Sequence, residues 1–163
     1  MKAVVYNEYA PDDNYAKILK VQDIDDPKPK ADEVVFTVKS AALNYNDIWG
    51  MRGNPVPVPL PHVSGSDAAG DVIAVGEDVT NIKVGDRVVS HSNMSCRVCK
   101  ACTDGREFDC TKRTIWGFQT GPNWGAFQEV THLPEVNVSK IPEGVSYDDA
   151  AAASMTILTS WHM

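Results

Sequence analysis

The amino-acid sequence predicts a mainly β, barrel-like body that ends in a single helix. Two observations favour this fold class. Up to residue 145, short runs rich in β-branched and aromatic residues alternate with glycine and proline, a pattern typical of small all-β bodies. Residues 146–163 instead combine a helix-capping pattern with an alanine run, which favours a helix at this end of the chain.

The predicted strands are short, and Glu33–Leu43 is the clearest of them. Its apolar residues Val34, Phe36 and Val38 recur at every second position, which is the period of a half-buried strand. The other predicted strands are Lys2–Tyr6, Lys17–Val21, Ala69–Val75, Asp86–Ser90, Phe127–Thr131 and Val136–Lys140. Asn54–Pro61 has proline at every second position, which excludes both a helix and a central strand.

The helix is predicted to begin after Ser146, because an acidic residue, Asp149, follows three positions later. Asp148 and Asp149 also suit the positive end of the helix dipole. The end of this predicted helix, up to Met163, has no glycine, no proline and no basic last turn, so it carries no helix-ending signal. We therefore expect that the natural protein continues and that this helix leads into a further domain.

Composition excludes several classes of partner. The formal net charge is −7 and no block of basic residues is present, so neither nucleic acid nor an anionic membrane surface is an expected partner. The first residues, MKAVVYNEYAPDD, do not resemble a secretory signal. We expect a cytoplasmic protein, in which thiols stay reduced.

All four cysteines lie in one short segment with the spacing C-x2-C-x2-C-x7-C. They are Cys96, Cys99, Cys102 and Cys110. Two-residue gaps let a tight turn aim two sulfurs at one point, and four thiolates suit a closed, structural zinc site. The segment's basic residues, Arg97, Lys100, Arg106, Lys112 and Arg113, could offset the charge of such a site. An iron–sulfur cluster, an iron electron-transfer site and two disulfides are alternatives, but the bacterial ferredoxin run continues differently and disulfides need an oxidising compartment.

Several stretches resemble the medium-chain dehydrogenases/reductases, the superfamily of zinc alcohol dehydrogenases and quinone oxidoreductases. They are the opening MKAVVY, the glycine-rich Gly65–Val89 and the passage Gly125–Met163. The resemblance implies a GroES-like β-barrel catalytic domain over residues 1–145, with a structural zinc lobe at residues 95–113. Residues 146–163 would begin the linker helix towards a Rossmann domain that this chain lacks.

The same resemblance implies the cofactors and partners. NADP or NAD would be bound mainly by the missing domain, with no cofactor-binding residue in this chain. The substrate would be a small molecule, and the full-length protein a homo-oligomer.

The resemblance also predicts how the active site differs from that of zinc alcohol dehydrogenases. Asn44, Ser66 and Met155 align with the three ligands of the family's catalytic zinc, and none supplies the thiolate or imidazole that such a site needs. Zinc-free members reduce activated C=C bonds, in which the substrate's own carbonyl takes up the developing charge. The motifs N-Y-N-D-I-W, H-V-S-G-S-D and W-G-F-Q-T look closest to 2-enoyl-CoA reductases of the crotonyl-CoA reductase type. Gln119 replaces the glutamate typical of carboxylating members, so plain reduction is predicted.

Asn44, Tyr45 and Asp47 are the candidate catalytic residues. Asn44 could donate its amide N–H to a thioester or ketone oxygen, Tyr45 could donate a proton, and Asp47 matches an acidic position of the family. Each also has a structural interpretation as a turn residue, a packed tyrosine or a loop-holding carboxylate. The aromatic residues could line an acyl pocket or form ordinary core; they are Trp49, Trp116, Phe118 and Trp124.

The predicted function is NAD(P)H-dependent reduction of an enoyl thioester, enone or quinone without catalytic zinc. The alternatives are an alcohol dehydrogenase domain and a non-catalytic, zinc-stabilised binding module.

Overall fold

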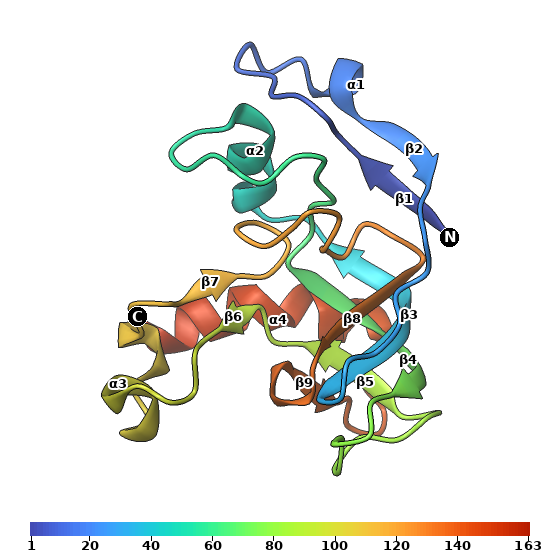
Figure 1. Ribbon diagram of the computed structural model, residues 1–163, viewed down its shortest axis with the longest axis vertical. Coiled ribbons are helices and arrows are strands. Elements are labelled where there is room, and N and C mark those ends of the chain that lie inside the picture. The colour runs from blue at the N-terminus through green and yellow to red at the C-terminus, as the bar shows by residue number, and fades with distance from the viewer.

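A curled antiparallel sheet forms the centre of the protein in the computed structural model, which describes residues 1–163. Its strand order is β8-β3-β4-β5-β9 (Figure 1). The strands are β3 (Glu33–Ala42), β4 (Asp67–Val75), β5 (Arg87–Ser90), β8 (Val130–Pro134) and β9 (Val138–Lys140). Register shifts after Val35 and Val38 interrupt the β3–β4 ladder, and such bulges increase the bend of a sheet. The prediction of a mainly β, barrel-like body is therefore confirmed.

Shorter elements surround this sheet. A hairpin-like pair joins β1 (Lys2–Val5) to β2 (Lys20–Asp23), with the one-turn helix α1 (Tyr15–Ile18) between them. Helix α2 (Tyr45–Arg52) follows β3. The cysteine segment leaves the body between β6 (Asn93–Met94) and β7 (Thr114–Ile115), and it contains α3 (Lys100–Thr103) and the 3-10 turn η1 (Glu107–Asp109).

Three strand predictions differ in detail from the structure. Lys17–Val21 begins as α1, because one helical turn places Ile18 in a buried cluster with Ala10 and Met51. Residues 127–128 pair with β1 and the Ser64 loop rather than with β3, so β8 starts only at residue 130. Residues 135–137 form the 3-10 turn η2 (Glu135–Asn137) before β9.

The η2 turn positions the side chain of Asn137. The Asn137 amide donates to the backbone carbonyls of His91 and Asn93 at 2.8 and 2.9 Å. The turn therefore fixes the chain as it leaves β5 for the cysteine segment.

Two buried clusters make up most of the core. The larger lies inside the curl of the sheet and contains Val34, Phe36, Ala68, Val72, Ile82, Val88, Trp116, Ala126, Leu133 and Val138. The second lies beneath α2 and contains Tyr6, Ala10, Ile18, Met51, Val58 and Phe118. No cluster residue comes from the cysteine segment, so burial of apolar surface, which stabilises the body, contributes little to that segment.

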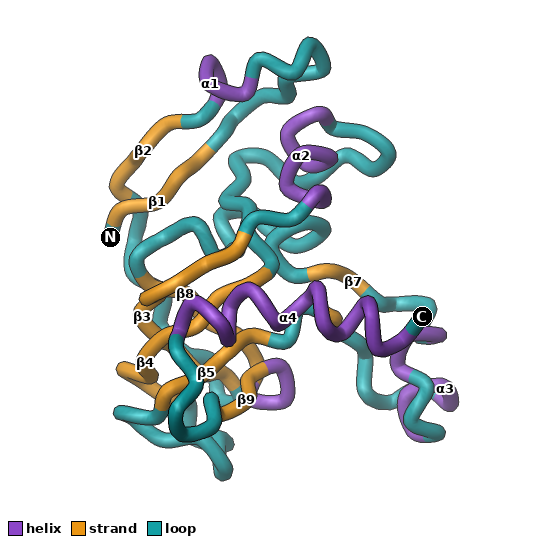
Figure 2. Tube along the Cα trace, turned by 180° about the vertical axis from the view of Figure 1, so that it is seen from behind, coloured by secondary structure: helices purple, strands orange, loops and turns teal.

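Helix α4 (Tyr147–His162) crosses the strands of the sheet and ends beside the α3 segment (Figure 2). Ser146 caps it as predicted, since its hydroxyl accepts the backbone N–H of Asp149 at 3.0 Å. Its first turns are buried through Ala150 and Ala151. The Tyr147 hydroxyl donates to the Asp71 carboxylate at 2.5 Å, which joins the helix to β4. The predicted helix is confirmed. No helix is long and apolar enough to cross a membrane.

The backbones of the central strands β3 and β4 lie very close together at Gly70. A Cβ atom at Gly70 would lie 1.6 Å from the Thr37 carbonyl oxygen, whereas one at Gly85 would meet nothing within 4 Å, although Gly85 has a φ of 90°. We expect Gly70→Ala to lower the free energy of unfolding by about 3 kcal/mol, because the β3 and β4 backbones must separate. Gly85→Ala should cost about 1 kcal/mol for its left-handed backbone alone. Urea unfolding measures both, and equal losses would contradict this packing.

Candidate metal centre and active site

The four cysteine sulfurs converge on one point. All four Sγ atoms lie within 4.8 Å of one another; Cys96 and Cys102 are 3.9 Å apart and Cys99 and Cys102 are 3.4 Å apart. A tetrahedral zinc with Zn–S bonds of about 2.3 Å requires sulfurs separated by about 3.8 Å. No two of the cysteines form a disulfide. The donor set and its spacing therefore suit a zinc tetrathiolate.

The local backbone favours thiolates but cannot stabilise four of them. Backbone N–H groups of Val98 and Cys99 point at the Cys96 sulfur and lower its pKa to about 6. The Cys99 sulfur receives the backbone N–H of Cys102, which lowers its pKa, yet the neighbouring thiols raise that pKa to about 11. Like charges this close repel, so a bound cation is needed before all four sulfurs can be ionised together.

The cysteine segment, residues 95–113, lacks a core of its own. Its two large apolar side chains, Val98 and Phe108, are 80 % and 46 % exposed. Because apolar burial cannot order the segment, a metal held by the four sulfurs would supply this order, as metals do in small structural zinc modules.

Most of the segment's basic residues are engaged with carboxylates. Arg97 pairs with Glu107 and Lys100 with Asp104. Arg106 contacts both Asp104 and Asp109. We expected all five basic residues to offset the negative charge of a zinc tetrathiolate. Three of them are instead paired with neighbouring carboxylates.

A second site gathers around Asp67, the first residue of β4. Its carboxylate is fully buried. One oxygen accepts the backbone N–H of Met155 in α4 at 2.8 Å, and the other accepts the side-chain amide of Asn44, just before α2. Burial raises the pKa of Asp67, and the hydrogen bonds from Met155 and Asn44 oppose that rise. Asn44 and Met155, two of the three aligned positions, thus meet at this one carboxylate.

Ser66, the third aligned position, directly precedes Asp67, but its hydroxyl is bonded to Asn46 and not to the Asp67 carboxylate. The Asn46 amide donates to the Ser66 hydroxyl at 2.8 Å. The Ser154 hydroxyl donates to the carbonyl oxygen of Ser90, at the end of β5, at 2.6 Å. This set offers amides, hydroxyls and one carboxylate, but no thiolate or imidazole.

Asn46 is a site residue that was not singled out from the sequence. Its side chain is buried, and its Oδ1 atom has no hydrogen-bond partner. An unpaired buried acceptor is costly, so this atom is available to a bound water or ligand. The signal was present in the N-Y-N-D motif, where two asparagines stand two positions apart.

Asp47 has a clear structural role. Its carboxylate accepts the backbone N–H of Asn44 at 2.8 Å and that of Gly65 at 2.9 Å, so it caps α2 and attaches the helix to the loop before β4. Burial raises the pKa of Asp47 to about 6, although both backbone hydrogen bonds oppose the rise. It also lines an apolar cavity of about 330 Å³ between β1, α2 and Phe127.

Tyr45 lies on the surface of α2, away from the Asp67 cluster. It is 61 % exposed, its ring meets the edge of Trp49, and its hydroxyl accepts from Arg52 at 3.5 Å. The structure therefore brings Asn44, but not Tyr45, into the cluster.

The four aromatic residues do not gather around one acyl pocket. Trp116 is fully buried in the sheet core, and Trp124 stacks on His132 at 5.1 Å. Only Trp49 and Phe118 are neighbours, with ring centroids 6.4 Å apart. Core packing accounts for Trp116 and Trp124.

Comparison with known proteins gives consistent relatives. Residues 30–143 match the model of the alcohol dehydrogenase GroES-like domain. The chain is 33 % identical over 151 residues to crotonyl-CoA carboxylase/reductase of Cereibacter sphaeroides, covering 89 % of this chain and 34 % of that protein. It is 32 % identical over 138 residues to L-threonine 3-dehydrogenase of Francisella philomiragia, covering 82 % of this chain and 38 % of that protein.

Solved structures share the fold. A crystal structure of an NAD-dependent alcohol dehydrogenase superimposes with a TM-score of 0.91 at 38 % identity, covering 100 % of this chain and 46 % of that one. A crotonyl-CoA carboxylase/reductase superimposes with a TM-score of 0.81 at 28 % identity, covering 93 % and 36 %. This chain therefore spans less than half the length of the relatives it matches.

Replacing one thiolate should unfold the cysteine segment and leave the sheet intact. We expect Cys110→Ser to lower bound zinc below one per chain and to abolish amide protection across residues 95–113, because structural zinc supplies about 10–16 kcal/mol to small modules. Hydrogen exchange should show β3 and β4 unchanged. Thr111→Ala, an exposed neighbour, is the control. If the amide protons of this segment stayed protected after zinc chelation, the result would contradict ordering of the segment by a metal.

Asp47 should make stability fall as the pH rises. Its folded pKa of about 6 exceeds its ordinary value of 3.8, so the folded state binds the proton more tightly. That contribution is present below pH 4 and is lost as the pH rises to about 6, a loss of up to about 3 kcal/mol. Asp47→Asn should flatten the dependence in urea unfolding between pH 4 and 6. Parallel curves for the two proteins would show that Asp47 does not titrate there.

Proposed function

Because the chain belongs to the alcohol dehydrogenase GroES-like domain family of the medium-chain dehydrogenases/reductases, we propose that it is the catalytic part of an NAD(P)H-dependent reductase of activated C=C bonds. The substrate class is an enoyl thioester, an enone or a quinone. In this proposal residues 1–145 form the catalytic domain and residues 146–163 begin the linker to a cofactor-binding domain. The four cysteines hold a structural zinc.

The composition of the Asp67 cluster carries this proposal. Asn44, Ser66 and Met155 align with the ligands of the family's catalytic zinc. Asn44 contributes an amide and Met155 a backbone N–H to the buried Asp67 carboxylate, and Ser66 contributes a hydroxyl that is bonded to Asn46. A catalytic zinc takes three protein ligands drawn from thiolate, imidazole and carboxylate. The cluster offers one such group, which is too few to polarise an alcohol through a metal.

Reduction of an activated double bond needs hydrogen-bond donors instead. NAD(P)H would supply the hydride to the β-carbon and become NAD(P)⁺, and the electron pair of the double bond would move towards the carbonyl oxygen. The α-carbon would then take a proton from water. The chain's part is to stabilise the oxygen that gains charge. The Asn44 amide has two N–H groups. One is held by Asp67, which orients the amide and leaves the second for that oxygen.

An alcohol dehydrogenase domain is the second candidate, because an NAD-dependent alcohol dehydrogenase and a threonine dehydrogenase are among the similar proteins. This candidate requires a second zinc near Asp67. A zinc-stabilised binding module is the third, and it requires that no hydride transfer occurs in the full-length protein.

Zinc counting separates the first two candidates. We expect desalted protein to hold one zinc per chain, unchanged after incubation with excess zinc, because only the tetrathiolate has a complete ligand set. Elemental analysis of the wild type beside Cys110→Ser provides the control. A second, tightly held zinc that disappears in Asp67→Asn would support the alcohol dehydrogenase instead.

A hydride-transfer assay of the full-length gene product tests the reaction itself. Oxidation of NAD(P)H should depend on a 2-enoyl thioester, an enone or a quinone, and Asn44→Ala should slow it by about 10²–10³-fold, as loss of one oxyanion donor does. Reduction of NAD(P)⁺ by a primary alcohol, with no activity towards these acceptors, would contradict the proposal.

A further inference from the structure

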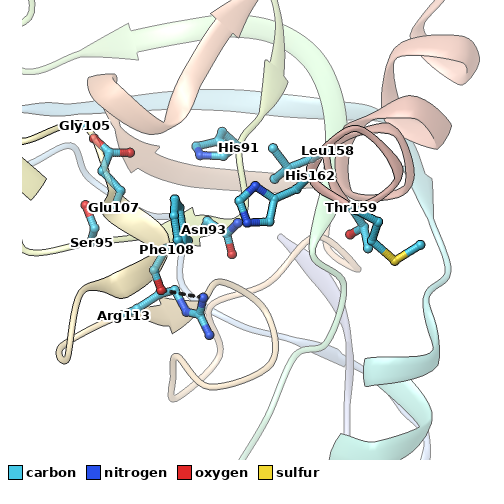
Figure 3. A pocket seen from close by; sticks show the side chains of 11 residues that line it. His91, Asn93, Ser95, Gly105, Glu107, Phe108, Arg113, Leu158, Thr159 and His162 are labelled. Carbon is cyan, nitrogen blue, oxygen red and sulfur yellow. Dashed lines mark hydrogen bonds between the residues drawn. The ribbon is translucent and has the colours of Figure 1, made fainter. Parts of the chain in front are cut away.

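A cavity of about 350 Å³ lies between the cysteine segment and the last turns of α4 (Figure 3). Its walls come from three parts of the chain that are distant in sequence. They include His91 and Asn93 after β5, Phe108 and Arg113 of the cysteine segment, and Thr159 and His162 of α4. The ring centroids of Phe108 and His162 are 4.6 Å apart, so the segment and the helix meet across this space.

Arg113 gives the cavity an uncompensated positive charge. Its Nη1 donates to the Phe108 carbonyl at 2.9 Å, and Arg113 forms no ion pair, unlike Arg97 and Arg106 of the same segment. The one carboxylate in the wall, Glu107, is already bound to Arg97. The remaining N–H groups of the Arg113 guanidinium are therefore free, in the planar fork that matches carboxylate and phosphate oxygens.

Neutral hydrogen-bond donors accompany this charge. His91 and His162 both point into the cavity in Figure 3, and an imidazole retains one N–H donor even when uncharged. The Asn93 side chain adds an amide. A guanidinium with two imidazoles and an amide forms a donor-rich wall suited to an anion.

The chain connects the cavity wall to the Asp67 cluster through neighbouring residues. His91 follows Ser90, whose carbonyl oxygen accepts the Ser154 hydroxyl at 2.6 Å. Ser154 precedes Met155, whose N–H donates to Asp67. One side of α4 thus carries residues of both sites, with Thr159 one turn beyond Met155. The helix that reaches the Asp67 carboxylate therefore also forms a wall of this cavity.

We propose that the cavity binds an anionic group of the substrate, a carboxylate or a phosphate, with Arg113 as its charged partner and His91 and His162 as hydrogen-bond donors. That the anion belongs to the substrate rests on the reductase function proposed above, whereas anion binding itself does not. The volume lies at the lower end for ligand sites, so it suits a small acyl or phosphoryl end rather than an entire nucleotide.

Nuclear magnetic resonance of the zinc-loaded chain tests this proposal. The imidazole signals of His91 and His162, assigned with His91→Gln and His162→Gln, are followed while inorganic phosphate or butyrate is added at constant ionic strength. We expect a saturable shift of both signals, with affinity reduced about tenfold or more in Arg113→Gln, the loss expected for a charge-assisted hydrogen bond. The tighter of the two probes identifies the group as phosphate or carboxylate.

The matched control is Arg106→Gln, because Arg106 belongs to the same segment but is ion-paired and lies outside the cavity. It should bind both probes as the wild type does. Equal weakening in the two variants would indicate general surface charge and overturn the site, as would a shift that does not saturate. Loss of zinc from Arg113→Gln alone would assign Arg113 to the metal centre and also overturn it.

Failure of this inference is distinct from failure of the proposed function. Absence of anion binding together with reductase activity of the full-length protein would overturn the site and leave the function intact. Anion binding together with no hydride transfer would leave the site intact and overturn the function.

Discussion

The buried carboxylate of Asp67 is the contact on which the organisation of this protein depends. A carboxylate without exposure to water is tolerated only when its oxygens are hydrogen-bonded, and here the donors come from α4 and from the residue before α2. The same interaction therefore attaches the helix to the sheet and assembles the polar cluster. The buried carboxylate of Asp47 acts in the same way, because it accepts two backbone N–H groups that hold α2 against the loop leading into β4.

The cysteine segment follows a different physical rule. Its apolar side chains are exposed and most of its basic residues pair locally with carboxylates, so neither burial nor long-range charge can hold it against the body. A metal bound by the four converging sulfurs would replace the missing core. Once ordered, the segment forms one wall of a cavity whose other walls belong to the sheet and to α4. The proposed metal site and the proposed anion site therefore share this segment, although none of the four cysteines lines the cavity.

Much of this architecture was readable from local patterns. The alternation in Glu33–Leu43, the Ser146 cap and the cysteine spacing each depend on neighbours a few residues away, and each predicted its element. The errors also have local causes. Ile18 adopts a helical turn in order to reach a buried cluster, and residues 127–128 pair with β1 rather than β3. In both places a tertiary partner outweighed a weak β propensity.

The residue types of the polar cluster were likewise evident from the chain, but their connections were not. The family resemblance aligned Asn44, Ser66 and Met155 with the three ligands of a catalytic zinc. The cysteine spacing alone indicated a structural zinc site. Only the folded structure shows that Met155 reaches Asp67 across 88 residues, that Asp47 is engaged by two backbone groups, and that Arg113 faces a cavity without a carboxylate partner. The physical reason is that spacing along the chain specifies local geometry, whereas the pairing of charges and buried polar atoms depends on which distant elements the packed core brings into contact.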